Sequence, residues 1–133
     1  VDKHIGDSVM VLFGAPFSFH DDAIRAVSSA VDMQKEARRL REQKGLDLHL
    51  GIGVCTGDVV TGVFGSLRKK EYTAFGMAVN MAARLEKMAK PGEILVSEST
   101  YGEVTERFKA EVIGPPVPIK GVTDPIAVYR IVI

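Results

Sequence analysis

Apolar residues recur at helical spacing in one long stretch of the chain. In residues 20–44 they fall three or four positions apart, at Ala23, Ala26, Ala30, Met33, Ala37 and Leu40. This spacing gathers apolar side chains on one face and predicts an amphipathic helix. Asp21 and Asp22 suit the positive start of that helix, and Lys44-Gly45 suits its end. A second helix is predicted over residues 77–89. It is expected to end there because Pro91-Gly92 follows, and proline cannot continue a helix.

Shorter apolar or alternating runs predict strands. Residues 46–54 alternate, with Leu46, Leu48 and Leu50 on one face. Gly6-Asp7 predicts a hairpin turn between strands at residues 1–5 and 8–13. Gly57-Asp58 predicts a turn into the next strand. Further strands are predicted over residues 59–64, 94–96, 110–113, 117–120 and 126–133, and residues 71–76 predict a strand or turn that leads into the second helix.

Thr100 and Glu103 have the spacing of a capping box, which predicts a short third helix that ends at Phe108. The predicted order of elements is β-β-α-β-β-α-β-α, followed by the closing strands. Because tight turns join neighbouring strands, the strands are expected to pair mainly antiparallel. The predicted fold class is therefore α+β, with a mixed sheet, in one domain that spans residues 1–133. The Gly-rich positions do not form a phosphate-binding loop, since no GxxxxGK[ST] is present.

Composition narrows the classes of function. Lysine plus arginine and aspartate plus glutamate both total 17, so no general charge favours nucleic acid or membrane surfaces. Any anion site must be local. The single cysteine, Cys55, excludes an internal disulfide and lies in an apolar run, which favours a buried structural thiol over a nucleophile. There is no apolar stretch long enough to cross a membrane and no signal peptide, so we expect no membrane contact by this chain.

The segment EYTAFGMAVNMAARLE, residues 71–86, carries the most suggestive chemistry. Asn80 and Arg84 lie one turn apart on the predicted helix, so both side chains can reach the same object. A guanidinium matches phosphate oxygens bidentately, and an amide can hold a sugar oxygen. Thr73 precedes Asn80 by seven residues. The alternative is ordinary: Arg84 is a solvated surface charge, or pairs with Glu86 or Glu71, although an asparagine inside a helix is mildly unfavourable and calls for a reason.

Asp7 and Lys3 form a second group, in VDKHIGD. Asp7 is either a simple turn residue or a carboxylate ligand for Mg²⁺. One carboxylate does not make a metal site, and no partner carboxylate is obvious nearby. Lys120 precedes Gly121, and this pair of residues is a common loop ending.

The chain resembles the catalytic domain of class III nucleotidyl cyclases, the adenylyl and guanylyl cyclases. The matching stretches occur in the family's order and cover nearly the whole chain: VDKHIGDSVMVLFGAP, LHLGIGVCTGDVVTGVFGS, YTAFGMAVNMAARLE, PGEILVSESTY and IKGVTDPIAVYRI. The resemblance implies a ferredoxin-like mixed, mainly antiparallel sheet with helices packed on it. It also implies cyclisation of a nucleoside triphosphate with release of pyrophosphate, in which two Mg²⁺ or Mn²⁺ ions assist attack of the ribose 3′-oxygen on the α-phosphate.

Roles for individual residues follow from the resemblance. Asp7 matches one of two metal-binding aspartates. Lys3 and Thr73 match the pair that selects the purine, and Ala74 and Phe75 lie where the family lines the base pocket. Asn80 and Arg84 match the pair that positions the ribose and stabilises the transition state. Lys120 matches a lysine that touches the triphosphate.

The base can be argued from hydrogen-bonding patterns. Adenine offers an acceptor at N1 and a donor at its amino group, which complement the ammonium of Lys3 and the hydroxyl of Thr73. Guanine offers a donor at N1, so Lys3 would face it with a second donor, and a buried unpaired polar group costs about 1–3 kcal/mol. We therefore expect ATP as substrate and cyclic AMP as product. A threonine at position 73 also resembles the subgroup associated with bicarbonate stimulation.

The resemblance further implies a head-to-tail homodimer with active sites at the interface, so that Lys3 and Asp7 serve different sites. The family's first strand, which carries the other metal aspartate, is absent. We therefore expect a partial domain from a longer, cytoplasmic protein, with or without a membrane anchor, and an isolated chain with little or no activity. Two alternatives remain: a catalytically silent dimerising or nucleotide-sensing module, and a guanylyl cyclase. A cyclic-dinucleotide synthase is disfavoured because its Gly-Gly-Asp/Glu-Glu-Phe signature is missing.

Overall fold

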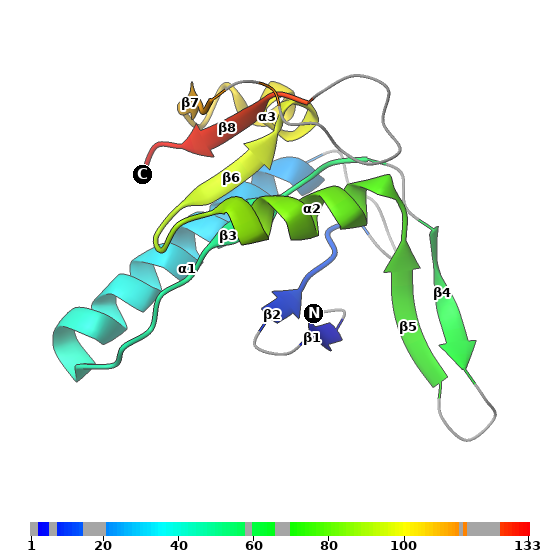
Figure 1. Cartoon of the computed structure of the whole chain (residues 1–133), viewed down its shortest axis with the longest axis horizontal. Coiled ribbons are helices and arrows are strands. Elements are labelled where there is room, and N and C mark those ends of the chain that lie inside the picture. Colours follow the sequence, from blue (N-terminus) through cyan, green and yellow to red (C-terminus); the bar gives the residue numbers. More distant parts are fainter. Residues whose placement is uncertain are drawn as a thin grey trace.

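The fold is known from a computed structural model, which describes residues 3–5, 8–14, 21–57, 60–65, 70–114, 116 and 126–133. The elements, in chain order, are β1 (Lys3–Ile5), β2 (Ser8–Met10), α1 (Asp22–Lys44), β3 (Ile52–Val54), β4 (Val60–Gly65), β5 (Lys70–Phe75), α2 (Met77–Met88), β6 (Ile94–Ser97), α3 (Glu98–Val104), β7 (Ala110–Val112) and β8 (Val128–Ile131). Figure 1 shows their arrangement.

The described strands form three sheets. The largest has the order β3-β6-β8-β7, and two hairpins, β1–β2 and β4–β5, form the others. β3 pairs with β6 in parallel, with Ile52 opposite Ile94, whereas the other described pairings are antiparallel. The mixed, mainly antiparallel α+β fold is therefore confirmed. The connection from β3 to β6 passes through the β4–β5 hairpin and then α2, and the hairpin extends away from the four-stranded sheet (Figure 1).

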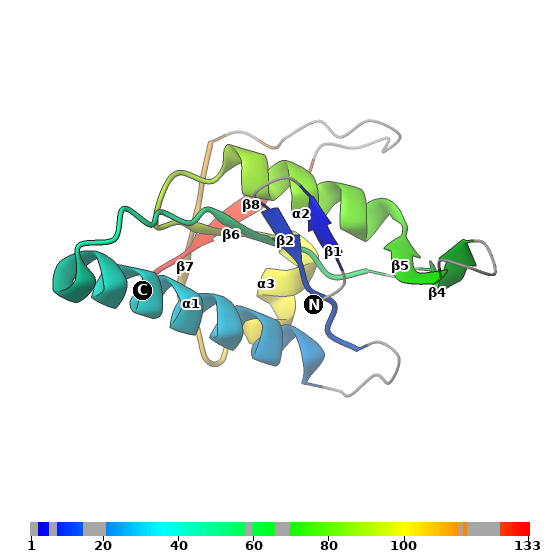
Figure 2. The same cartoon turned by 90° about the horizontal axis from the view of Figure 1, so that it is seen from below.

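Helices cover both faces of the four-stranded sheet (Figure 2). On one face α1 packs its apolar stripe, including Val27 and Ala30, against Ile94 and Val96 of β6. On the other face Met81 and Leu85 of α2 pack on Leu95 and Val128. Successive side chains of a strand point to opposite faces, so all four residues of β6 are buried. This central strand holds the two apolar clusters together.

The first helix keeps the predicted end and begins two residues later than predicted. It runs over Asp22–Lys44 and stops at Gly45, whose φ of 67° lies in the left-handed region that glycine adopts without strain. The N–H of Gly45 donates to the carbonyl of Leu40. The helical period of the alanines, Met33 and Leu40 therefore predicted the position of the helix, and Gly45 predicted its end.

The strand predicted over residues 46–54 is wrong in its first half, because β3 begins only at Ile52. The reason is visible in the hydrogen bonds of the preceding segment. The carbonyl of Leu48 accepts from Arg41 Nη1 at 2.7 Å, and that of Leu50 accepts from Gln34 Nε2 at 2.9 Å. A side chain of α1 thus satisfies the Leu48 carbonyl, which a strand would pair with a neighbour, while the Leu50 carbonyl also accepts from the backbone N–H of Gly92 at 2.7 Å.

The capping box predicted at Thr100 and Glu103 is also wrong. Ser97 is the N-cap of α3, and its hydroxyl accepts from the N–H of Thr100 at 3.3 Å. Thr100 is fully buried in the first turn, where its hydroxyl lies 2.8 Å from that of Thr56. The helix ends at Val104, short of the predicted Phe108.

The remaining predicted strands differ mostly at their ends. The strand predicted over 59–64 corresponds to β4, and residues 70–75 form the strand β5. The strand predicted over 126–133 is shorter, since β8 covers Val128–Ile131. The Gly6-Asp7 and Gly57-Asp58 turns lie wholly or partly outside the described residues, and so does the strand predicted over 117–120.

Candidate active site

Strand β5 passes into helix α2 through a single residue, Gly76. Its backbone has φ 152° and ψ 169°, a combination that is essentially restricted to glycine. The carbonyl of Gly76 accepts the first helical hydrogen bond, from the N–H of Asn80 at 3.2 Å. The strand that carries Thr73 and the helix that carries Asn80 and Arg84 are therefore joined without a flexible loop.

Asn80 and Arg84 lie on the exposed side of α2. The helix buries Ala78, Met81 and Leu85, and both polar side chains are exposed to solvent. Within the described part of the chain neither side chain has a hydrogen bond or ion pair, so Arg84 does not pair with Glu86. An amide and a guanidinium one turn apart, both unpartnered there, can together contact one polar anionic ligand.

The other predicted site residues fall into two groups. Thr73, Ala74 and Phe75 lie on β5, opposite Gly62, Thr61 and Val60 of β4. Lys3 lies on β1, opposite Met10 in the separate two-stranded sheet. Asp7 and Lys120 lie outside the described residues. The structure therefore brings positions 73–75, 80 and 84 onto one continuous strand–helix unit and leaves Lys3 on a different hairpin.

The predicted metal site is not tested by the described residues. Among them, no group of three or more His, Cys, Asp or Glu side chains is arranged to hold a metal ion. Asp7, the predicted ligand, lies outside them.

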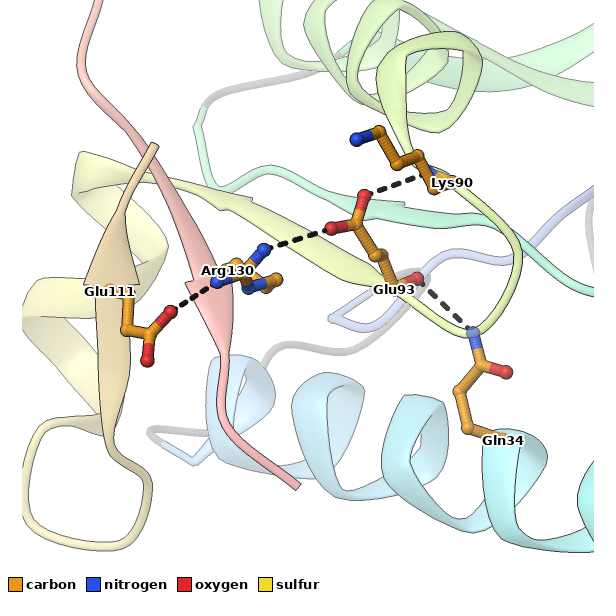
Figure 3. A network of polar contacts seen from close by, with 5 residues as sticks. All are labelled: Gln34, Lys90, Glu93, Glu111 and Arg130. Atoms are coloured by element: carbon orange, nitrogen blue, oxygen red, sulfur yellow. Dashed lines mark hydrogen bonds and ion pairs between the residues drawn. The ribbon is translucent and has the colours of Figure 1, made fainter. Parts of the chain in front are cut away.

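A polar network that the sequence reasoning missed fixes the turn at the end of α2 (Figure 3). The carboxylate of Glu93 accepts from the backbone N–H of Lys90 at 2.8 Å and from Arg130 Nη1 at 3.2 Å. Arg130 also bonds Glu111 on β7. The Lys90 amide, followed by Arg130, lowers the pKa of Glu93, while the two carboxylates, Glu111 first, raise the pKa of Arg130.

Gln34 ties this turn to α1. It is buried, and its Nε2 donates to the carbonyl of Glu93 at 3.1 Å as well as to that of Leu50. A signal for this role was present in the sequence, because Gln34 interrupts the apolar face of α1 between Ala30 and Ala37. A polar residue on such a face needs a hydrogen-bond partner inside the protein.

A hollow of about 500 Å³ lies beside the inner face of α2. Its lining includes Cys55, Met77, Met81, Ser97 and Ser99, and does not include Asn80 or Arg84. The thiol of Cys55 lies 3.4 Å from the sulfur of Met81, and burial raises its pKa. A thiol that is protonated at neutral pH is a poor nucleophile, so the expected structural role of Cys55 fits this environment.

Comparison with known proteins identifies the family. Residues 3–132 match the family described as the adenylate and guanylate cyclase catalytic domain. An adenylate cyclase of Mycobacterium tuberculosis is 37% identical over 106 residues, which cover 80% of this chain and 24% of that protein. The chain thus spans about a quarter of the length of this curated relative.

Two solved structures extend the similarity to the fold. The adenylyl cyclase CyaB from P. aeruginosa superposes with a TM-score of 0.87 at 37% identity, over 98% of this chain and 70% of that chain. The guanylyl cyclase Cya2 superposes with a TM-score of 0.83, also at 37% identity, over 98% of this chain and 68% of that one. None of the described helices is long and apolar enough to cross a membrane. The chain belongs to the adenylate and guanylate cyclase catalytic domain family.

Proposed function

We propose that the protein containing this chain converts ATP to 3′,5′-cyclic AMP and pyrophosphate. The observation that carries the proposal is the pair Asn80 and Arg84, exposed on one side of α2 with no partner among the described residues. Family membership supports the reaction class. The proposed reaction forms a bond between the ribose 3′-oxygen and the α-phosphorus and breaks the bond from that phosphorus to the oxygen that leaves with pyrophosphate. The proton of the 3′-hydroxyl passes to solvent.

Arg84 would act mainly in the transition state. Negative charge grows on the phosphoryl oxygens as the leaving group departs, and a guanidinium placed in advance stabilises that charge with little reorganisation. The amide of Asn80, one turn away, would hold a ribose oxygen without changing the charge of the site. Two Mg²⁺ or Mn²⁺ ions, with Asp7 as one ligand, belong to the proposal and would neutralise charge on the triphosphate when bound.

The test of Arg84 is its replacement by alanine in the full-length protein. Arg84→Ala is expected to lower kcat by about 10²- to 10³-fold with a smaller change in KM, because the lost contact belongs to the transition state. Lys87→Ala is the matched control, since Lys87 is another exposed cation on α2. Cyclic AMP formation is followed at saturating ATP. A change confined to KM, or equal losses in both variants, would remove Arg84 from its proposed role.

The choice of ATP over GTP rests on Lys3 and Thr73. Adenylyl and guanylyl cyclases both resemble this chain at 37% identity, so the substrate is argued from the two residue types. Lys3→Glu with Thr73→Cys would offer guanine an acceptor for N1–H and a donor for O6. The double variant is expected to raise the GTP:ATP ratio of kcat/KM at least tenfold, which corresponds to about 1.4 kcal/mol. An unchanged ratio would contradict the base-reading role, and a wild-type protein that prefers GTP would make it a guanylyl cyclase.

A second copy of the chain is the proposed partner, in a head-to-tail dimer. Family membership supports this arrangement, in which Asp7 of one copy would face Asn80 and Arg84 of the other. Lys3 would read the base from the same copy as Arg84, so Lys3 and Asp7 of one chain would serve different sites.

A further inference from the structure

Helix α2 lies directly against the backbone of β3 at Gly53. A Cβ atom at this position would stand 2.5 Å from both the carbonyl oxygen of Ala82 and the N–H nitrogen of Glu86, and 2.8 Å from Leu85 Cβ. Ordinary van der Waals contact begins at 3.4 Å, so an added methyl group is about 0.9 Å too close to two backbone atoms. Backbone atoms in the middle of a helix cannot turn aside as a flexible side chain can.

Gly51 extends the same contact toward the end of the helix. A Cβ atom there would stand 2.9 Å from the carbonyl oxygen of Ala89 and 3.2 Å from its Cβ. Gly51 and Gly53 are two residues apart in nearly extended chain, so they face α2 together. We call these two residues the glycine strip. It lets α2 approach β3 more closely than any side chain would permit.

Other contacts hold both β3 and α2 in place. β3 is held by its parallel pairing with β6, in which Gly53 lies opposite Leu95. The segment before β3 is held through the carbonyl of Leu50 by Gln34, and the turn after α2 is held through Glu93. Because β3 belongs to the sheet, a methyl group at Gly53 must displace α2, together with the exposed side chains that it carries.

We propose that Gly53 is a positioning residue for catalysis: by excluding a side chain under Ala82 and Glu86, it sets the position of α2 and so aims Arg84 and Asn80 at the substrate. This role rests on the proposed function of those two side chains. Ala82 and Glu86 flank Arg84 in the helix, so the displacement acts where the guanidinium is anchored. A misplacement of about 1 Å in a catalytic group can lower a rate about 10²-fold.

The experiment compares three glycine-to-alanine variants of the full-length protein. Gly53→Ala is expected to lower kcat about 10- to 100-fold and to change KM less than about threefold. Gly51→Ala, which meets only the end of the helix, is expected to lower kcat about three- to tenfold. Gly102→Ala is the control, because a Cβ at Gly102 in α3 meets nothing within 4 Å, and its kcat should stay within about twofold of wild type. Far-UV circular dichroism at the assay temperature confirms that each protein is folded.

A double-variant test separates positioning from general damage. If Gly53 acts through the groups on α2, Gly53→Ala should reduce kcat of the Arg84→Ala enzyme by less than about threefold, although it reduces the wild-type enzyme at least tenfold. Independent, multiplicative losses would overturn the proposal, and so would wild-type kcat in Gly53→Ala. If Gly53→Ala does not fold, Gly51→Ala combined with Arg84→Ala gives the same test. A wild-type rate for Arg84→Ala alone would instead refute the proposed function.

Discussion

At the scale of single residues, Glu93 shows how one carboxylate can join several elements. Its two side-chain oxygens accept from the Lys90 amide in the turn after α2 and from Arg130 on β8, while its backbone carbonyl accepts from Gln34 on α1. The side chain is only 18% exposed, so solvent screens these contacts less than it would on an open surface. The contacts favour the ionised form, which is why the pKa of Glu93 is lowered.

Replacing Glu93 by glutamine tests this contribution through its pH dependence. The folded-state pKa lies below the value of 4.5 for a free carboxyl group, so the stabilisation is complete above that value and is lost as pH falls through the folded-state pKa. Glu93→Gln is expected to lower the free energy of unfolding by about 0.5–1 kcal/mol at pH 7, after discounting for solvent screening at the half-exposed Arg130.

Urea titrations at pH 7 and at pH 4 measure the difference between the two proteins. The difference should shrink at the lower pH, and a gap that is constant with pH would contradict the assignment. Glu103→Gln, at an exposed position in α3, serves as the control and should leave the free energy of unfolding within about 0.5 kcal/mol of wild type.

Part of the candidate site could be predicted from the sequence, because the residue types and the helical spacing that identify it lie within one short segment. Asn80 and Arg84 were placed on one exposed helix face from their spacing alone, and the structure agrees. Ser97 was not predicted as the N-cap of α3, because Thr100 and Glu103 have the spacing of a capping box. In the structure Thr100 is buried, with its hydroxyl near that of Thr56, and Ser97 caps the helix. The role of Gly53 could not be predicted from the sequence, because a side chain at this position clashes only once α2 is packed on β3.

At the scale of elements, the junction between β5 and α2 depends on Gly76. Its backbone conformation lets the strand end and the helix begin without intervening residues. Any side chain larger than hydrogen meets steric conflict in this region, so another residue would force the chain to rearrange on one side of the junction.

Gly76→Ala is therefore expected to lower the free energy of unfolding by about 1–3 kcal/mol. Gly102→Ala provides a contrast, since Gly102 lies within α3 and is not among the described glycines with positive φ. That control should be neutral or stabilising by up to about 1 kcal/mol, because alanine has the higher helix propensity. Chemical denaturation of both variants gives the comparison, and equal stability of Gly76→Ala and wild type would show that the junction tolerates a side chain.

At the scale of the whole molecule, most elements and their order were predictable, but their partners were not. The pattern of apolar and turn residues predicted α1, α2 and the strands that correspond to β6, β7 and β8. It could not reveal that β3 pairs in parallel with β6, or that β8 lies between β6 and β7, since such pairings bring together residues far apart in sequence. The placement of α1 and α2 on opposite faces followed only from the burial of all four residues of β6.

The proposed dimer makes a prediction for mixtures of inactive proteins. If Asp7 and Arg84 contribute to each site from different copies, a dimer of Asp7→Ala with Arg84→Ala holds one intact site and one doubly altered site. Random exchange of equal amounts should then restore cyclic AMP formation to about a quarter of the wild-type rate. Mixtures that stay as inactive as either variant alone would show that both residues serve a site from the same copy. Co-purification of an untagged variant with a tagged one is the control that shows exchange of copies.

The parallel pairing of β3 with β6 has a consequence for how this domain can diversify. After β3 the chain forms the β4–β5 hairpin and then α2, which leads to β6. The hairpin is therefore inserted into a strand–helix–strand crossover between β3 and β6. Residues added to or removed from the connection between β4 and β5 would leave both ends of the crossover in place. Natural insertions and deletions should therefore accumulate there, while the stretch from Gly76 to Ile94 keeps a constant length across family members.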